Sequence, residues 1–351
     1  MKNIAVISTD WHIDTGNVEL SKQLAAQQIQ LAKDSGVKLL ICLGDIFENK
    51  KGQPEIVLNC FEQILDMVQE AGMTLWAIAG NHDKTNPYSW ESYLYPYKTH
   101  PGLVLIEDQA EMKIDGDITC VFQSYIKESL WVEKLQEYLA SAKKGKKYLF
   151  SHQAMNGSRN NDGSKMESTI NASLLSSFEK CFFGHYHDAQ QPLPNAYHLA
   201  AWKQKNFGEN DEKGFYVLYK NADGILDVEF HKSNFTQYVT IEVDAGQLNT
   251  EAISSIIEQN KQAENQSFRV SIKGSTSELK SIPVKKLEDA GIKVKMTDTA
   301  ERQKVETGEK VQDYEKDESL LEAFRSFCLE KEFSYEEGLT YLTAILENGT
   351  V

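Results

Sequence analysis

The sequence predicts an α/β (α+β) fold: a large layered domain in residues 1–232, a small α+β domain in residues 233–299 and a helix pair in residues 319–351. In the first domain, short apolar runs alternate with helix-period stretches, which is typical of layered sheets and helices. Residues 300–318 are polar, charged and nearly free of large apolar side chains, as in a linker. A chain of 351 residues has room for this division, since single cores stop growing near about 250–300 residues.

The strands of the large domain are predicted from short apolar runs with the length and composition of buried strands. Two helix-period segments lie between them, Glu19–Asp34 and Glu55–Ala71, and each is followed by a glycine that signals a C-cap, Gly36 and Gly72. The predicted strands are Ile4–Ser8, Leu39–Leu43, Thr74–Ala79, Tyr148–Phe150 and Cys181–Phe183, then a closing hairpin of Phe215–Tyr219 and Ile225–His231.

The small domain is predicted from patterns in the order strand, helix, strand, helix, strand. After the linker, apolar residues resume with helical spacing, and Ser334 with Glu337 forms a capping-box signature for the second helix of the pair. The predicted elements of the small domain are Tyr238–Val243, Thr250–Gln262, Phe268–Ile272, Ser277–Ala290 and Lys293–Met296.

The composition predicts a cytoplasmic protein. The longest apolar runs, such as Leu39–Leu43, are far shorter than the roughly 20 residues of a membrane span. The apolar run Ile4–Ile7 is too short for a secretory signal. The five cysteines are scattered and form no C-x-x-C pair, so neither a disulfide framework nor a thiolate zinc site is indicated.

The net charge of −15 opposes nucleic-acid binding, because proteins that bind a polyanion normally have a basic surface. The charge is unevenly distributed: residues 301–351 hold 13 acidic and 6 basic residues, which account for −7 of the total. Divalent cations bound by acidic residues would offset more of the negative charge. The distribution weakens the objection to a nucleic-acid substrate without removing it.

Each of the first five predicted strands is followed at once by a cluster of polar residues. Ligand sites in open sheets gather at the carboxyl ends of strands, so these clusters are expected to converge. One such cluster is more often a turn or a helix cap, but five of the eight histidines lie at these strand ends, which favours a metal site. Oxygen and imidazole donors suit Mn, Fe or Zn rather than Cu(I) or an iron–sulfur cluster. The candidate ligands are Asp10, His12, Asp45, Asn81, His152, His185 and His187.

In order, the clusters resemble the five motifs of the calcineurin-like metallophosphoesterases, and the resemblance covers residues 1 to about 190. It implies a four-layer β-sandwich flanked by helices that binds two divalent metal ions and hydrolyses phosphoesters. Two such cations would lower the pKa of a water molecule and neutralise a phosphate oxygen. The motifs are Asp10-Trp11-His12, Gly44-Asp45, Gly80-Asn81-His82-Asp83, His152 and Gly184-His185-Tyr186-His187.

The resemblance also implies a role for each motif residue. His82 would be catalytic, stabilising the developing charge or protonating the leaving oxygen. Asp83 would orient His82, with a cap of the loop as the alternative role. One metal would be held by Asp10, His12 and His187 and the other by Asn81, His152 and His185, with Asp45 bridging both.

A narrower resemblance concerns the substrate. Phosphoprotein phosphatases of this family have Asp-Arg-Gly after the second motif, whereas this chain has Ile46–Asn49. Gly44–Phe47 and Asn206–Phe215 instead resemble the SbcD-type nucleases of DNA double-strand-break repair. The second stretch is most similar to the small subunit of T-even-type phage recombination endonucleases, and a short cellular SbcD is the alternative. Two positions depart from the pattern: Glu48, where many repair nucleases have a histidine, and Ala200-Ala201, where relatives usually have Gly-Ser.

This resemblance implies a Mn-dependent DNA nuclease, with Mg, Fe or Zn as alternative metals. It would act as a 3'-5' exonuclease on double strands and an endonuclease on single strands, in DNA replication, recombination and repair. The implied partner is an SMC-like ATPase of the SbcC type bound through residues 319–351, with a homodimer of this chain in a heterotetramer. Residues 233–299 would form a capping domain that recognises DNA, and the location would be the cytoplasm of a bacterial or phage-infected cell.

Basic residues in two loops predict contacts with DNA. The run Lys143–Lys147 is more often a solvated turn. The predicted DNA contacts are Arg159, Lys165, Lys203 and Lys205, which follow the fourth and fifth motifs. The alternative function is a stand-alone metallophosphodiesterase acting on nucleotides or lipids. A catalytically silent scaffold is disfavoured, since no ligand of the motifs is missing.

Overall fold

The computed structural model describes residues 1–299 apart from 117, 144, 161–163 and 263–265. The linker predicted at 300–318 and the helix pair predicted at 319–351 lie outside the described residues. The domain boundaries predicted from the sequence stay a prediction. By its internal contacts the chain divides into two compact units, Met1–Ile241 with Ile256–Arg269, and Glu242–Ser255 with the residues from Val270 onward.

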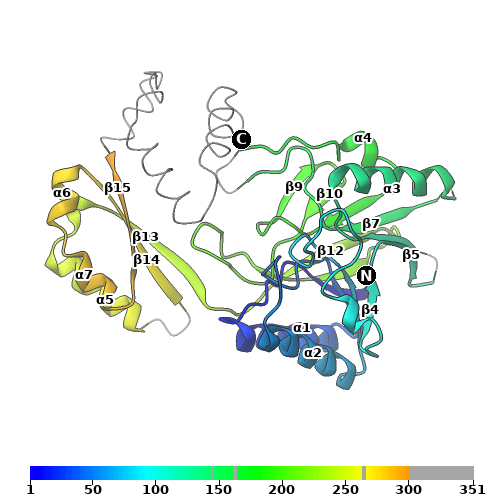
Figure 1. The fold of residues 1–351 in the computed structure, drawn as a ribbon, viewed down its shortest axis with the longest axis horizontal. Helices are drawn as coiled ribbons and strands as arrows, with labels where there is room; N and C mark the ends of the chain where they lie inside the picture. The colour runs from blue at the N-terminus through cyan, green and yellow to red at the C-terminus, as the bar shows by residue number, and fades with distance from the viewer. Residues whose placement is uncertain (117, 144, 161–163, 263–265, 300–351) are drawn as a thin grey trace, which may run out of the picture. The chain divides into compact units, whose positions relative to one another are not determined.

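The first unit contains a six-stranded sheet built around four parallel strands (Figure 1). In order across the sheet the strands are β12 (Leu226–Lys232), β11 (Gly214–Lys220), β1 (Lys2–Ser8), β2 (Leu39–Cys42), β3 (Thr74–Ile78) and β4 (Leu103–Ile106). Strands β1 to β4 pair in parallel, as their apolar sequences favour. Strands β11 and β12 form the predicted closing hairpin, and β11 pairs antiparallel with β1.

A second six-stranded sheet packs against the first. In order across the sheet its strands are β5 (Gln109–Ile114), β6 (Ile118–Gln123), β7 (Lys147–Ser151), β8 (Lys180–Phe183), β10 (Ala196–His198) and β9 (Gln190–Leu193). Side chains from both sheets share one buried core, in which Ile7 and Ile41 belong to the same cluster as Phe122, Phe150 and Phe182. The two sheets therefore form a β-sandwich.

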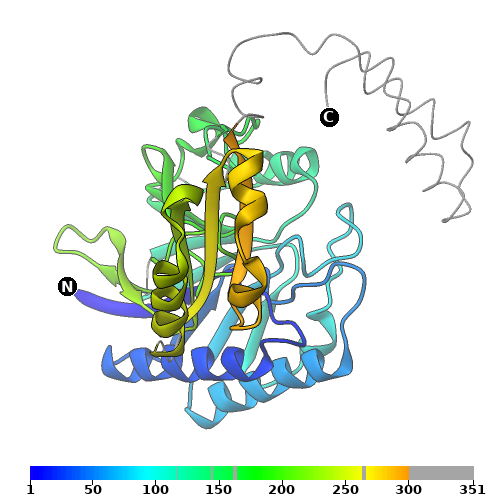
Figure 2. The same cartoon turned by 90° about the vertical axis from the view of Figure 1, so that its left-hand side faces the viewer.

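Helices cover both outer faces of the sandwich, which completes the predicted four layers. Figures 1 and 2 show α1 and α2 side by side, and Phe61 of α2 shares a core with Leu75 of β3. On the other sheet, Trp131 of α3 is buried with Leu149 of β7. The helices are α1 (Val18–Asp34), α2 (Glu55–Glu70), α3 (Glu128–Ser141) and α4 (Ala172–Leu175), and the glycines predicted after the first two, Gly36 and Gly72, have φ of 70° and 68°.

A third sheet has three strands in the order β13, β14, β15. The prediction of a single helix at Ser277–Ala290 is wrong, because the segment forms two short helices. Pro283 has no backbone N–H and disfavours a helical residue before it, and Ile282 is extended with ψ of 129°. The elements are β13 (Gln237–Asp244), α5 (Thr250–Gln262), β14 (Gln266–Gly274), α6 (Thr276–Ser281), α7 (Val284–Glu288) and β15 (Lys293–Asp298), with short 3₁₀ helices at Tyr95–Tyr97 and Ala245–Gln247.

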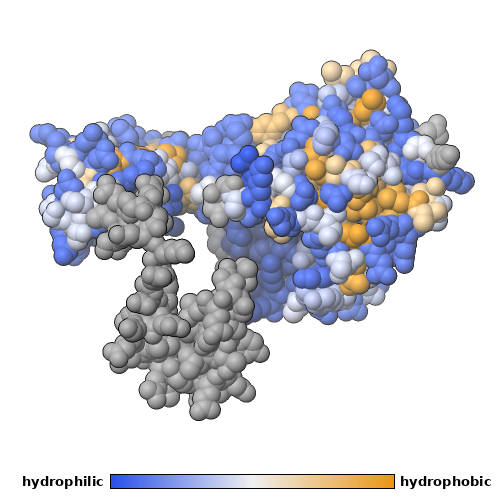
Figure 3. Space-filling view, turned by 90° about the horizontal axis from the view of Figure 1, so that it is seen from above, coloured by the Kyte–Doolittle hydropathy of each residue, from blue (hydrophilic) through white to orange (hydrophobic). Residues whose placement is uncertain are grey.

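The exposed surface, the helices and the cysteines bear on the features that were read from the composition. The face in Figure 3 is mainly hydrophilic, with hydrophobic residues exposed between the hydrophilic ones. Among the described residues, none of the helices has both the length and the apolar character needed to cross a bilayer. The four cysteines within the described ranges, Cys42, Cys60, Cys120 and Cys181, are buried free thiols.

Candidate metal centre

The candidate ligands lie where strands of the two sheets end. Asp10 and His12 follow β1, Asp45 follows β2, Asn81 follows β3, His152 follows β7, and His185 and His187 follow β8. Four of them have left-handed backbone conformations, with φ of 52° at Asp10, 49° at His12, 53° at Asp45 and 86° at His185. Such angles are unfavourable for residues with a side chain and gather at functional sites.

Glycines allow the loops after the strands to approach one another. A Cβ atom at Gly80 would lie 2.1 Å from Asp45 Oδ1. A Cβ atom at Gly184 would lie 2.2 Å from Thr9 Oγ1 and 2.8 Å from His152 Nδ1. These distances are far shorter than van der Waals contact, so the motif glycines are required by the close packing around the ligands.

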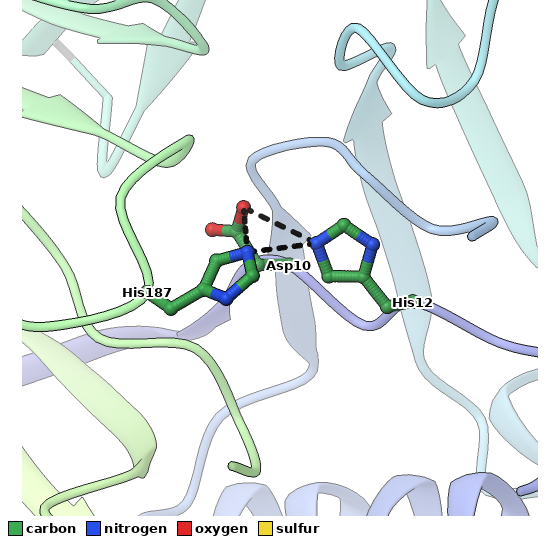
Figure 4. Close-up of side chains that lie close together, drawn as sticks. All are labelled: Asp10, His12 and His187. Carbon is green, nitrogen blue, oxygen red and sulfur yellow. Dashed lines mark hydrogen bonds and ion pairs between the residues drawn. The ribbon is translucent and has the colours of Figure 1, made fainter. Parts of the chain in front are cut away.

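One group of three ligands comes from β1 and β8. Figure 4 shows the side chains of Asp10, His12 and His187 pointing toward one another. The Nε2 atoms of the two histidines are 3.0 Å apart, and each lies 3.9 Å from Asp10 Oδ1. This cluster of two imidazole nitrogens and a carboxylate oxygen has the composition of a divalent-cation site.

A second group gathers around Asn81. Its Oδ1 atom lies 3.1 Å from His152 Nε2 and 2.8 Å from His185 Nδ1. His152 is fully buried, and its Nδ1–H donates to the carbonyl oxygen of Leu43 at 2.7 Å. That hydrogen bond fixes a proton on Nδ1 and turns Nε2 of His152 toward Asn81, the orientation that a metal ligand requires.

Asp45 lies between the two groups. Its Oδ2 atom is 3.3 Å from His152 Nε2 and 3.7 Å from His12 Nε2. Its Oδ1 atom accepts the backbone N–H of His82 at 2.8 Å. One buried carboxylate therefore faces both groups of histidines, which is the arrangement that a ligand shared by two cations requires.

Burial and neighbouring carboxylates determine the protonation of the histidines. Burial lowers the pKa of His12 and of His185 to about 3, so both rings are neutral. Burial also disfavours protonation of His152, but Asp45 and Asp10 raise its pKa to about 9. The carboxylates thus attract positive charge at His152, and a divalent cation would supply it in place of the proton. The donors and their protonation fit two divalent cations.

His82 and Asp83 each form hydrogen bonds with the backbone of neighbouring loops. The Nδ1–H of His82 donates to the carbonyl oxygen of Glu48 at 2.6 Å. The buried carboxylate of Asp83 accepts the backbone N–H groups of Phe47 and Gly80 at 2.9 and 2.8 Å. The hydrogen bonds of Asp83 therefore fit its alternative predicted role, a cap that holds the loops after β2 and β3 together, and the Glu48 backbone orients His82.

Three residues that support the ligands were not assigned this role from the sequence. The His187 Nδ1–H donates to Glu209 Oε1 at 2.8 Å, and Lys213 Nζ donates to the His187 carbonyl oxygen at 2.7 Å. Glu48 Oε2 lies 2.8 Å from His12 Nδ1. The sequence pointed to Glu209 and Lys213 in part, because both lie in the stretch that resembles repair nucleases. Their contact with His187 depends on how the loops fold and could not be predicted.

The four basic residues predicted to contact DNA lie in two environments. Arg159 and Lys165 are exposed and face each other across an isolated antiparallel bridge. Lys203 is only 5% exposed, and Lys205 Nζ lies 2.7 Å from Glu48 Oε2. Their roles as DNA contacts stay a prediction, and the burial of Lys203 and the ion pair of Lys205 argue against direct contact. In the lysine run, Lys143 and Lys146 are exposed.

Comparison with known proteins identifies the family. The family model of the calcineurin-like phosphoesterases matches residues 3–189 of this chain. Exonuclease subunit 1 of enterobacteria phage T4 is 21% identical over 198 residues, which is 55% of this chain and 56% of the phage protein. The chain thus spans little more than half the length of this relative.

Two solved structures of low similarity also match. A dimetal phosphatase from Danio rerio is 12% identical, with 62% of this chain and 92% of that chain covered and a TM-score of 0.37. The calcineurin-like phosphoesterase YfkN from Bacillus subtilis is 13% identical, with 74% and 97% covered and a TM-score of 0.36.

The fold and the converging ligands define the class of protein, a metal-dependent phosphoester hydrolase. Because the family model covers more than half of the sequence, the chain belongs to the calcineurin-like phosphoesterase family. Enzymes of this family use a dimetal centre.

Proposed function

We propose that this protein is a DNA nuclease that hydrolyses phosphodiester bonds with two divalent cations. The observation that supports two cations is the position of Asp45, whose Oδ2 atom lies within 3.7 Å of a histidine nitrogen of each ligand group. The similarity to a phage exonuclease subunit supports DNA as the substrate. Mn²⁺ is the proposed metal, because oxygen and imidazole donors without thiolate suit it.

In this proposal the seven candidate ligands divide between two positions. Asp10, His12 and His187 would hold one cation (the Asp10 position), Asn81, His152 and His185 would hold the other (the Asn81 position), and Asp45 would be shared by both. When bound, the two cations would activate water and neutralise charge on the phosphate. The contribution of the chain would be to hold the cations and to orient the phosphodiester.

His82 is the proposed acid for the leaving oxygen. Its ring lies 4.8 Å from that of His12, centroid to centroid, and its backbone N–H is fixed by Asp45 Oδ1. Since the Glu48 carbonyl can only accept, Nδ1 carries a proton. Nε2 is therefore the atom that gives a proton to the leaving oxygen, in the imidazolium form of the ring.

The DNA backbone is proposed to pass Arg159 and Lys165, which are exposed in the loop after β7. Residues 233–299 are the proposed capping domain, and residues 319–351 the proposed binding segment for an SMC-like ATPase of the SbcC type. We expect 3'-5' exonuclease activity on duplexes and endonuclease activity on single strands, from a homodimer bound to that ATPase.

The experiment uses the full chain, freed of metals and then supplied with Mn²⁺. Labelled linear duplex, circular single-stranded DNA and bis(p-nitrophenyl) phosphate are the substrates, with and without the ATPase partner. DNA cleavage should require Mn²⁺, and His82→Ala should reduce it by roughly 10²- to 10⁴-fold. His100→Ala is the matched control, since His100 contacts Asp66 outside the ligand clusters. Hydrolysis of the nitrophenyl ester without any cleavage of DNA would refute the nuclease and favour the stand-alone phosphodiesterase.

A further inference from the structure

The two histidines at the Asp10 position each have a carboxylate beside Nδ1, the ring nitrogen that faces away from the ligand cluster. His12 Nδ1 lies 2.8 Å from Glu48 Oε2, and His187 Nδ1 donates to Glu209 Oε1 at 2.8 Å. Each outer nitrogen therefore faces a carboxylate. At the Asn81 position the outer nitrogen of His152 faces the neutral carbonyl oxygen of Leu43. The support of His152 thus differs in charge from that of His12 and His187.

Glu48 is joined to a second charged residue. Lys205 Nζ lies 2.7 Å from Glu48 Oε2, and the Lys205 backbone N–H donates to Glu209 Oε2 at 3.1 Å. Lys205 therefore connects the two carboxylates that face His12 and His187. The ion pair with Lys205 holds the Glu48 carboxylate in place. The contact with the neutral His12 ring is close but lacks the direction of an ideal hydrogen bond.

We propose that Glu48 is a positioning residue for metal binding: its carboxylate, held by Lys205, fixes the His12 ring so that Nε2 faces a cation at the Asp10 position. The inference rests on the proposed metal ligands but not on DNA as the substrate. It gives Lys205 a structural role in place of direct contact with DNA. Glu48 also supports His82, but through its backbone carbonyl, so a change of its side chain leaves that hydrogen bond in place.

The physical reason is the effect of an outer carboxylate on a histidine ligand. A carboxylate beside Nδ1 keeps the proton on that atom, fixes the ring orientation and makes Nε2 a stronger donor. Removing such a partner typically costs about 10- to 100-fold in metal affinity. The loss should be confined to the Asp10 position, because the Glu48 side chain contacts no ligand of the Asn81 position among the contacts that the described residues make.

The test is calorimetric titration of the metal-free full chain with Mn²⁺. The wild type should bind two ions, and His185→Ala should leave only the binding step of the Asp10 position. In the His185→Ala background, Glu48→Gln should weaken that step by about 10- to 100-fold. Asp14→Asn is the matched control for loss of a nearby negative charge, since Asp14 lines the same 220 Å³ cavity as His12 and Glu48 while its carboxylate accepts from Gly16.

An unchanged isotherm for Glu48→Gln, or a loss no larger than that of Asp14→Asn, would overturn the proposal. An equal loss for Glu48→Gln in a His12→Ala chain would also overturn it, because only the binding step of the Asn81 position remains in that chain and no loss is expected there. Circular dichroism and unfolding of each variant separate misfolding from a local effect. If the titrations behave as expected but no DNA is cleaved, the nuclease proposal fails while the role of Glu48 stands.

Discussion

Replacement of the buried Lys203 by methionine should make the protein more stable at neutral pH. Lys203 is only 5% exposed. Burial lowers its pKa to about 8, although Asp14, Glu48 and Glu209 favour the charged form. The ammonium group is thus held in an environment that disfavours it, and methionine fills a similar volume without charge.

The magnitude follows from the pKa difference between the folded and unfolded chain. An unfolded lysine has a pKa of about 10.4, and each tenfold change in proton affinity corresponds to about 1.4 kcal/mol. Keeping Lys203 charged at pH 7 therefore costs on the order of 3 kcal/mol. Between pH 8 and about 10.4 the unfolded chain binds more protons, so wild-type stability should rise with pH through that window.

The assay is urea unfolding of the wild type and Lys203→Met at pH 7 and pH 10. At pH 7 the variant should be roughly 2–3 kcal/mol more stable, and the gap should shrink by pH 10. Lys51→Met, at an exposed lysine, should change stability by less than about 0.5 kcal/mol. A Lys203→Met protein that is less stable than the wild type at pH 7 would show that the ammonium makes a net favourable interaction, and would refute this reasoning.

Three further changes test the site. Gly184→Ala should lower turnover of a nitrophenyl diester by about 100-fold, because its Cβ would lie 2.2 Å from Thr9 Oγ1; Gly36→Ala, whose Cβ would meet nothing within 4 Å, should keep turnover, and equal loss in both would contradict this. Trp202→Phe should cost about 1–3 kcal/mol in urea unfolding, because the Trp11 carbonyl loses its 2.9 Å donor; unchanged stability would contradict it. Mn²⁺ at 100 times its Kd should raise the free energy of unfolding by about 2.7 kcal/mol. Equal stabilisation of an Asp10→Ala chain by Mn²⁺ would argue against this site.

Strand ends were predictable from the sequence because their chemistry is local. An apolar run followed at once by Asp, Asn or His marks both a buried strand and the edge where it stops, and this places Asp45 and His152 correctly after β2 and β7. Strands β4, β5, β6, β9 and β10 were not predicted. Strand β5, Gln109–Ile114, has mixed polar and apolar residues on a sheet edge, so its sequence shows no continuous apolar run.

Contacts that depend on loop packing could not be predicted in the same way. Glu48 was recognised only as a departure from the histidine of many relatives, and its proximity to His12 and Lys205 arises from two loops far apart in the sequence. Asp83 shows the opposite case. Its motif suggested contact with the adjacent His82, but a carboxylate buried beside unpaired backbone N–H groups binds those first.

The backbone at the ligands explains why the site needs the rigid sandwich beneath it. Left-handed angles at residues with side chains cost on the order of 1–3 kcal/mol each and persist only where surrounding structure enforces them. Asp10, His12, Asp45 and His185 all have such angles, and each directly follows or flanks a buried parallel strand. The sheets therefore hold the donors in place before a cation arrives. Binding then requires little rearrangement. Trp202 donates to the carbonyl of Trp11, which lies between Asp10 and His12 in the sequence, so Trp202→Phe should reduce metal affinity as well as stability. Calorimetric titration of this variant with Mn²⁺ would measure the loss.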